Sequence, residues 1–306
     1  EFGGRDFGGI ELDAELDSQR LSGRISDRDE ALRLLLSVSG TLTEREQRIG
    51  LSGSVFGFDL AALGVSPEPI GGSFALDASA SAAGKGAYAA RIALDSIEIR
   101  NKHRTDRIRP TSVSLHTDSA ATRAEAASGD LSLTFSTPQS ADSLIAALTR
   151  SARTLAGQID AQSIDMEQLK PALPDFALRV SAGPDNILNS LLKSRKIAFD
   201  ALNAEGVNCD SLPVSIRLRT EGLAYGNVVL DTVTADIRQN GKRLEYALGL
   251  ANAPGNLDNI ARAGLYGHLV RNTGQANLYQ RNRAGREGFR FGLDVTWTDS
   301  LVRASV

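Results

Sequence analysis

The stretch FRFGLDVTW, residues 289–297, alternates apolar and polar side chains at every second position. Residues 32–38, LRLLLSV, repeat the alternation near the other end of the chain. Successive side chains of a β-strand point to opposite faces, so each segment makes one apolar face and one polar face. Because the alternation recurs along most of the chain, the sequence predicts a protein built mainly of strands.

The middle of the chain changes to helical spacing. After Thr137 as N-cap and Pro138 at the first helical position, residues 139–156 are predicted as a helix. Its apolar stripe is expected to pack on the sheet or to close an open end of it, and its members are Leu144, Ile145, Leu148, Ala152 and Leu155. Residues 185–193 predict a second helix, and residues 257–265, capped by Asn256, a third.

The composition excludes several classes of protein. The 306 residues are 42% hydrophobic and 23% charged, which is typical of a folded chain. A net charge of −3 argues against nucleic acid as the main partner, since phosphate binding needs a concentrated basic surface. The single cysteine, Cys209, excludes an internal disulfide and is predicted to be a buried, inert residue.

The residues that could carry catalysis do not form a recognisable constellation. His103, His116 and His268 are scattered, and no Gly-x-Ser-x-Gly elbow is present. Six basic residues between positions 100 and 109 are interpreted as a solvated loop. We therefore predict a non-enzymatic protein with no catalytic, cofactor-binding or metal-binding residues.

We predict a mostly β fold: an elongated, curled antiparallel sheet that forms a groove, with a few short helices inserted or capping it. The predicted parts are a β-groove segment at 1–137, a helix-containing insertion at 138–195 and a β-rich carboxyl-terminal segment at 196–306. The apolar side chains expected to line the groove, where acyl chains of phospholipid would lie, are Leu32, Leu34, Leu36, Val38, Val214, Ile216, Leu218, Leu244, Tyr246, Leu248, Leu250, Phe289, Phe291, Leu293 and Val295.

Two stretches carry a resemblance to a known family: GSVFGFDLAALGV at 53–65 and VVLDTVTADIRQNGKRLEYALGLANAPGNLDNIARAGLYGHL at 228–269. In their order of strand, helix and strand, they resemble the TamB-like translocation and assembly module family of the AsmA-like, repeating β-groove group. The resemblance is particularly to the family's forms from Bacteroidetes-like bacteria. The resemblance implies a periplasmic protein tethered to the inner membrane by a segment outside this chain. It also implies a role in phospholipid transport or outer-membrane protein assembly, with an outer-membrane barrel protein of the Omp85 type as partner.

Other interpretations of the same alternation stay open. The chain opens at Glu1 without a methionine, and we interpret it as an internal or carboxyl-side fragment of a longer protein. The apolar residues would equally form the closed core of a sandwich, which would make the chain a structural scaffold or an adhesin-like module with a dry interior. An outer-membrane barrel fragment would need aromatic girdles, which an aromatic content of 5% with one tryptophan does not supply.

Overall fold

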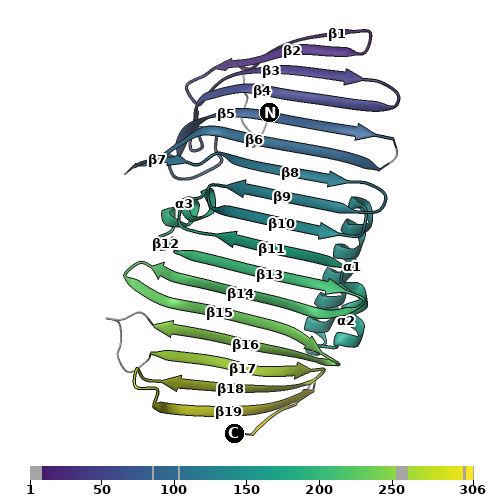
Figure 1. Ribbon diagram of the computed structural model, residues 1–306. Helices are drawn as coiled ribbons and strands as arrows, with labels where there is room; N and C mark the ends of the chain where they lie inside the picture. The colour runs from purple at the N-terminus through teal and green to yellow at the C-terminus, as the bar shows by residue number, and fades with distance from the viewer. Residues whose placement is uncertain (1–8, 85, 103, 253–260, 299–300, 306) are drawn as a thin grey trace. The chain divides into compact units, whose positions relative to one another are not determined.

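The alternating segments form strands. The computed structural model describes residues 9–84, 86–102, 104–252, 261–298 and 301–305. Strands hold 65% of the chain and helices 12%, and the strands form an antiparallel sheet that does not close on itself (Figure 1). The predicted fold class is therefore confirmed.

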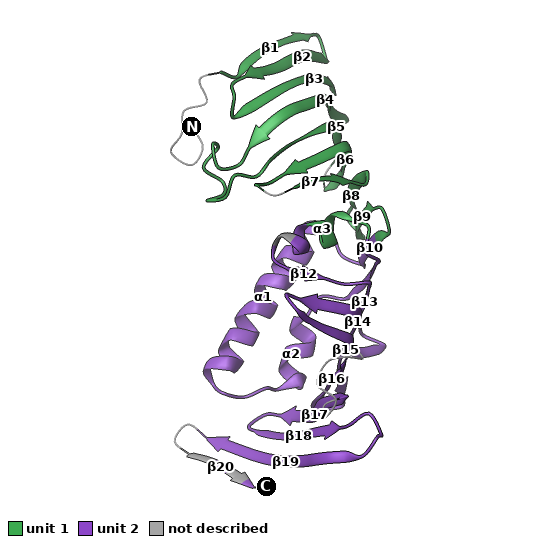
Figure 2. Ribbon diagram, turned by 90° about the vertical axis from the view of Figure 1, so that its left-hand side faces the viewer, with its two compact units in different colours: residues 1–131, 185–190 green, residues 132–184, 191–306 purple. Residues whose placement is uncertain are grey.

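The chain divides into two units, which Figure 2 shows in different colours. Unit 1 contains residues 1–131 and 185–190. Its strands follow each other as an antiparallel meander, in which both β7 and β8 pair with β6. They are β1 (Glu11–Asp17), β2 (Arg20–Arg28), β3 (Leu32–Leu42), β4 (Glu46–Asp59), β5 (Gly71–Ala83), β6 (Ala87–Arg100), β7 (Thr105–Ile108), β8 (Thr111–Thr117) and β9 (Thr122–Ser128).

Unit 2 contains residues 132–184 and 191–306. Its strands form a second antiparallel meander, in which the short β12 pairs with β14 beside β13. They are β10 (Leu131–Thr137), β11 (Phe176–Ala182), β12 (Ile197–Ala198), β13 (Ala201–Cys209), β14 (Leu212–Tyr225), β15 (Val228–Asn240), β16 (Arg243–Asn252), β17 (Arg262–Val270), β18 (Thr273–Arg281), β19 (Glu287–Thr298) and β20 (Leu301–Ser305).

In the part of the chain that the structure describes, three helices interrupt the strands: α1 (Ala141–Asp160), α2 (Met166–Ala172) and α3 (Ile187–Ser194). The first begins later than predicted, because Ser140 and not Thr137 is its N-cap: the Ser140 side chain accepts a hydrogen bond from the Ser143 N–H. Thr137 is instead the last residue of β10. Among the described residues, none of the helices has the length and apolarity needed to cross a bilayer.

Two predictions in the last part of the chain have different outcomes. The hairpin predicted at Asn240-Gly241 is confirmed, with Asn240 paired to Arg243 and Gly241 at a positive φ of 60°. The helix predicted at 257–265 begins outside the described residues. Its last part is wrong, because the chain from Arg262 onward is strand β17 and pairs with both β16 and β18.

Gly129, in the turn after β9, allows the backbone of Asp185 to approach closely. Its φ is +57°, and a Cβ there would lie against the Asp185 carbonyl oxygen and the Arg109 side chain. Gly84, with a φ of +60°, has open space where its Cβ would be. Both Gly→Ala substitutions add backbone strain of about 1 kcal/mol, so the difference between them isolates the contact with Asp185.

We expect Gly129→Ala to lower the free energy of unfolding by about 1–2 kcal/mol more than Gly84→Ala, since the Asp185 backbone must move aside. Urea unfolding of both variants measures this difference. Equal losses would mean that Asp185 yields to the new methyl group without cost.

Candidate functional site

The register of the strands sorts the apolar side chains of unit 1 onto one face, because directly paired residues of neighbouring strands lie on the same side. One row of such pairs crosses five strands through Val38, Leu51, Ala78, Ile92 and Val113. We call this side the apolar face of unit 1. It contains all four residues predicted from the first segment, namely Leu32, Leu34, Leu36 and Val38.

Much of the apolar face of unit 1 is open to solvent. Leu36 and Val55 are buried near its centre, whereas Leu12 is 66% exposed, Ile92 46% and Leu115 40%. The described strands of unit 1 form a single layer, so no second sheet of this unit covers the face. The result is a broad aliphatic surface where a closed sandwich would have a core.

The eleven candidates in unit 2 also share one face. A row of paired residues crosses six strands of that unit through Leu218, Ala235, Leu248, Leu265, Leu278 and Phe291. We call this side the apolar face of unit 2. The register places on it Val214, Ile216, Leu218, Leu244, Tyr246, Leu248, Leu250, Phe289, Phe291, Leu293 and Val295.

One end of this face is covered by α2. Met166 and Leu169 of the helix pack against Val214 in a buried cluster, and Leu244 lies against the same cluster. Val214 and Leu244 are therefore core residues of unit 2, whereas other candidates keep 37–48% of their surface exposed: Ile216, Leu248, Leu250, Phe289 and Phe291.

The helical hairpin of α1 and α2 is fastened to the strands of unit 2 by its connecting loop. Ile164 and Arg271 each donate a backbone N–H to the other's carbonyl, at 3.0 and 2.7 Å. The indole N–H of Trp297 donates to the Gln162 carbonyl oxygen. Within the hairpin, the Gln158 side chain bonds to both the N–H and the carbonyl of Asp165.

The packing of α1 differs from the prediction. Its buried residues are small or polar: Ala147, Ser151 and Gln158. The aliphatic residues at helical spacing are exposed instead, and we call them the α1 stripe: Ile145 at 62%, Leu148 at 52%, Leu155 at 41% and Ile159 at 60%. Of the predicted stripe, Ile145, Leu148 and Leu155 do not pack on the sheet, so the prediction is wrong for these residues. Hydrogen bonds of Ser151 and Gln158 to the α2 segment hold the helix by its polar side instead.

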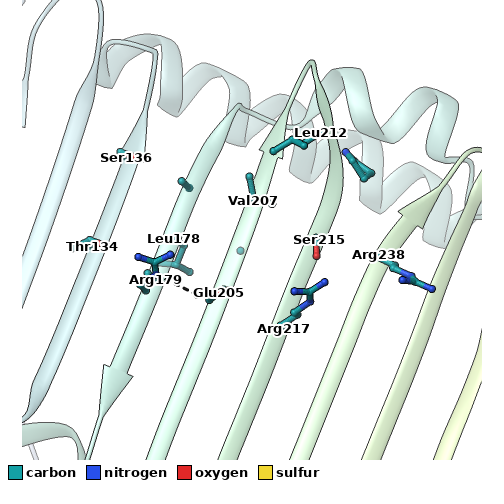
Figure 3. A pocket seen from close by; sticks show the side chains of 13 residues that line it. Thr134, Ser136, Leu178, Arg179, Glu205, Val207, Leu212, Ser215, Arg217 and Arg238 are labelled. Atoms are coloured by element: carbon teal, nitrogen blue, oxygen red, sulfur yellow. Dashed lines mark hydrogen bonds and ion pairs between the residues drawn. The ribbon is translucent and has the colours of Figure 1, made fainter.

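The opposite face of unit 2 is polar and holds a shallow hollow of about 620 Å³ (Figure 3). Arg179 on β11 pairs with Glu205 on β13 at 3.2 Å, and Arg217 on β14 with Asp236 on β15 at 3.4 Å. The paired groups are 43–74% exposed, so each pair contributes at most about 1 kcal/mol. We call this row of ion pairs between neighbouring strands the ladder. It keeps the face hydrated, and because its charges are paired it offers no concentrated charge to a ligand.

The ladder continues at the hairpin of β15 and β16. The Asn240 side-chain amide donates to one oxygen of Glu245 at 2.7 Å, and Arg238 donates to the other at 2.9 Å. These two hydrogen bonds, the amide first, lower the pKa of Glu245 below its ordinary value. The carboxylate thus stays charged and paired at neutral pH.

Side chains that could take part in acid–base or nucleophilic chemistry lie apart from one another on the surface. His116 lies 3.9 Å from Asp118 at an exposed turn, where the Ala120 and Ala121 backbone N–H groups lower the pKa of Asp118. A hydrogen bond with Ser211 lowers the pKa of Cys209, which is partly exposed and not buried as predicted. The described part of the chain contains no group of three or more potential metal ligands. The absence of enzymatic activity stays a prediction.

Comparison with protein-family models, with curated proteins and with solved structures found no match to this chain. The resemblance described above therefore rests on the two quoted stretches alone. The candidate site is defined by the geometry of the two apolar faces.

Sequence reasoning named only part of each face. The same register adds residues that carry the identical alternation signal on neighbouring strands, which could have been found by extending the pattern: Leu51, Phe74, Leu76, Ile92 and Leu94 in unit 1, and Val233, Ile237, Leu265 and Leu278 in unit 2. Three residues of the α1 stripe, Ile145, Leu148 and Leu155, were predicted from their spacing, whereas Ile159 lies beyond the predicted end of the helix. The exposure of the stripe depends on contacts that no local pattern shows.

Proposed function

We propose that this chain binds the acyl chains of phospholipids on the apolar faces of its two units, without catalysing a reaction. The observation that carries the proposal is that both faces are continuous across many strands and yet keep part of their aliphatic surface exposed. Folded proteins rarely leave contiguous aliphatic surface of this kind in water unless it contacts a lipid or another apolar partner.

The chemistry of the faces suits a sliding ligand. Hydrogen bonds between strands satisfy the backbone, so the faces present side chains alone to a ligand. Each methylene group that leaves water gains about 0.8 kcal/mol, so six buried methylenes retain a chain by roughly 5 kcal/mol. Since aliphatic contacts have no directional preference, the chain keeps this energy as it moves from one strand to the next.

The wider role is part of the proposal. We infer from the resemblance that the chain is a periplasmic segment of an envelope protein tethered to the inner membrane outside these residues. It would carry phospholipid between the inner and outer membranes or assist outer-membrane protein assembly, next to a barrel protein of the Omp85 type. The alternative is a structural scaffold or adhesin-like module, for which the exposed faces would need an apolar protein partner.

Leu34 and Leu35 provide a matched test in unit 1, because they are neighbours on β3 and face opposite sides. Leu34 pairs with Val55 on the apolar face, whereas Leu35 pairs with Ser54 on the polar face and is 40% exposed. We expect Leu34→Asp to reduce bound phospholipid at least tenfold, since the apolar contact that the leucine side chain loses is worth about 1.5–3 kcal/mol. Leu35→Asp should bind as the unchanged chain does.

Native mass spectrometry with lipid extraction, on chains expressed in a diderm bacterium, measures the bound phospholipid. Leu248→Asp with Ala247→Asp repeats the comparison in unit 2, where the two residues likewise alternate between faces. Circular dichroism confirms that each variant is folded. A folded, unchanged chain that carries no phospholipid would contradict the proposal and favour the scaffold.

A further inference from the structure

The polar face of unit 2 holds a second hollow, on the side of the sheet opposite the apolar face. It has a volume of about 360 Å³ and lies over the neighbouring strands β15, β16, β17 and β18 (Figure 1). The side chains that line it include Asp236, Arg238, Glu245, Tyr266, His268 and Gln275. Small-molecule sites usually have volumes of about 300–1,000 Å³, so the hollow has room for a small ligand.

Tyr266 brings an exposed aromatic ring to this polar surface. Its direct partners across the sheet are Ala247 on β16 and Asn277 on β18. The alanine is too small to cover the ring, and Tyr266 keeps 39% of its surface exposed. Tyr279 packs against Tyr266 with the ring centroids 6.3 Å apart and the planes at 56°. This tilted contact holds the Tyr266 ring in place.

The carboxylates and the guanidinium group that line the hollow already have partners. Arg238 donates to Glu245 at 2.9 Å, and Asp236 lies 3.4 Å from Arg217. An anionic ligand would therefore compete with a carboxylate of the protein, and a cationic ligand with an arginine. The pairing favours a ligand that carries no net charge.

Three polar side chains beside Tyr266 are available to such a ligand. His268 follows Tyr266 on the same side of β17, and Gln275 and Asn277 lie next to them on β18. Within the described residues, these three side chains have no hydrogen-bond partner. An amide and a neutral imidazole each carry both donors and acceptors. The hollow thus combines one apolar ring face with uncharged hydrogen-bonding groups around it.

We propose that this hollow binds a neutral saccharide, with a glucose-type pyranose ring stacked on Tyr266. One face of such a sugar ring consists of axial C–H groups, which pack on the negative face of an aromatic ring. Its hydroxyl groups point outward from the ring edge, where His268, Gln275 and Asn277 exchange hydrogen bonds with them. A nucleotide also stacks on tyrosine, but its phosphate groups would compete with Glu245 for Arg238.

This inference goes beyond the proposed lipid binding and does not depend on it. Tyr266 is paired with Ala247, whereas Leu248, the next residue of β16, lies on the apolar face. The two ligands would therefore occupy opposite sides of the same strands.

Saturation-transfer difference NMR with the full 306-residue chain tests the inference. The probe is cellotriose, a neutral trisaccharide of glucose, at about 10 mM, which is sufficient to detect a Kd of about 1 mM. We expect magnetisation transfer to the axial C–H protons of the sugar rings. Sorbitol carries hydroxyl groups but no pyranose ring, and it should receive at least tenfold less transfer.

Two variants of Tyr266 identify the stacked ring. Tyr266→Ala should weaken cellotriose binding at least tenfold, whereas Tyr266→Phe should retain it because the ring face is unchanged. Tyr225→Ala is the matched control, since Tyr225 is 68% exposed on β14 of the same unit and lies outside the hollow. Asn277→Ala should weaken binding roughly three- to tenfold through the loss of one hydrogen bond.

The outcomes separate this inference from the proposed function. Absence of transfer to cellotriose overturns the saccharide site, and so does equal transfer in the Tyr266→Ala chain or equal transfer to sorbitol. Phospholipid binding should be the same in the Tyr266→Ala chain and in the unchanged chain, because the ring lies on the polar face. Loss of both ligands in this variant would contradict the assignment of the two sites to opposite faces.

Discussion

Met166→Ala lowers the free energy of unfolding by about 3 kcal/mol, the largest single effect that we expect in this chain. Met166 is only 1% exposed and packs with Leu169 against Val214. Truncating a buried methionine removes its apolar contacts and leaves a cavity, which together cost about 2–5 kcal/mol. The same truncation loosens the attachment of α2 to the strands.

The chain carries its own probe for this change. Trp297 is the only tryptophan, and its indole N–H donates to Gln162 in the loop between α1 and α2. Urea unfolding followed by tryptophan fluorescence therefore reports on the hairpin. Leu148→Ala is the matched control, because this residue of α1 is 52% exposed and its truncation should cost less than about 0.5 kcal/mol. Equal losses in both variants would show that α2 is not what anchors the hairpin.

Asn186→Ala should lower the free energy of unfolding by about 2–3 kcal/mol. Asn186 is 1% exposed and precedes α3, where its Oδ1 accepts the Asn189 N–H at 2.9 Å. Its Nδ2 donates to Asp130 at 2.6 Å, and the other oxygen of Asp130 accepts the Asp185 N–H. Alanine removes a helix cap worth about 1 kcal/mol. It also removes the hydrogen bond to the Asp130 carboxylate, worth about 1.5–3 kcal/mol.

Asn203→Ala is the control for this prediction. Asn203 lies on the polar side of β13, is exposed and accepts one hydrogen bond, from Ser181 at 3.2 Å. Its loss should stay within about 0.5 kcal/mol. Thermal unfolding of both variants decides the point. A loss in Asn186→Ala no larger than in Asn203→Ala would mean that α3 is held by other contacts.

The faces of the sheet could be predicted from the sequence because the period of a strand is local. Leu34 and Leu36 had to share a side whatever their partners, and antiparallel pairing then placed Val55 and Gly53 beside them. The alternation identifies a face, but it does not tell whether another layer covers it. That distinction separates a dry core from an exposed surface, and it depends on the whole topology.

The helices show where local patterns stop being sufficient. The stripe of α1 has the spacing of a buried face, yet the side that packs is the one with Ser151 and Gln158. These two residues find their partners in Ala172 and Asp165, further along the chain, so the buried side is chosen by hydrogen bonds and not by hydropathy. The error at 257–265 has a similar origin, since Arg262–Val270 becomes strand by pairing with two neighbours.

The length of α1 has a mechanical consequence. Its 20 residues measure about 30 Å, and six steps of about 4.8 Å separate β10 from β17, a total of about 29 Å. The helix is joined to β10 through the short segment up to Ser140, and its far end is tied to Arg271, next to β17, through Ile164. A pull across these strands would therefore load a rigid rod as well as the sheet. We therefore expect unit 2 to resist stretching from β10 to β17, so that the width of its apolar face between these strands stays constant under load.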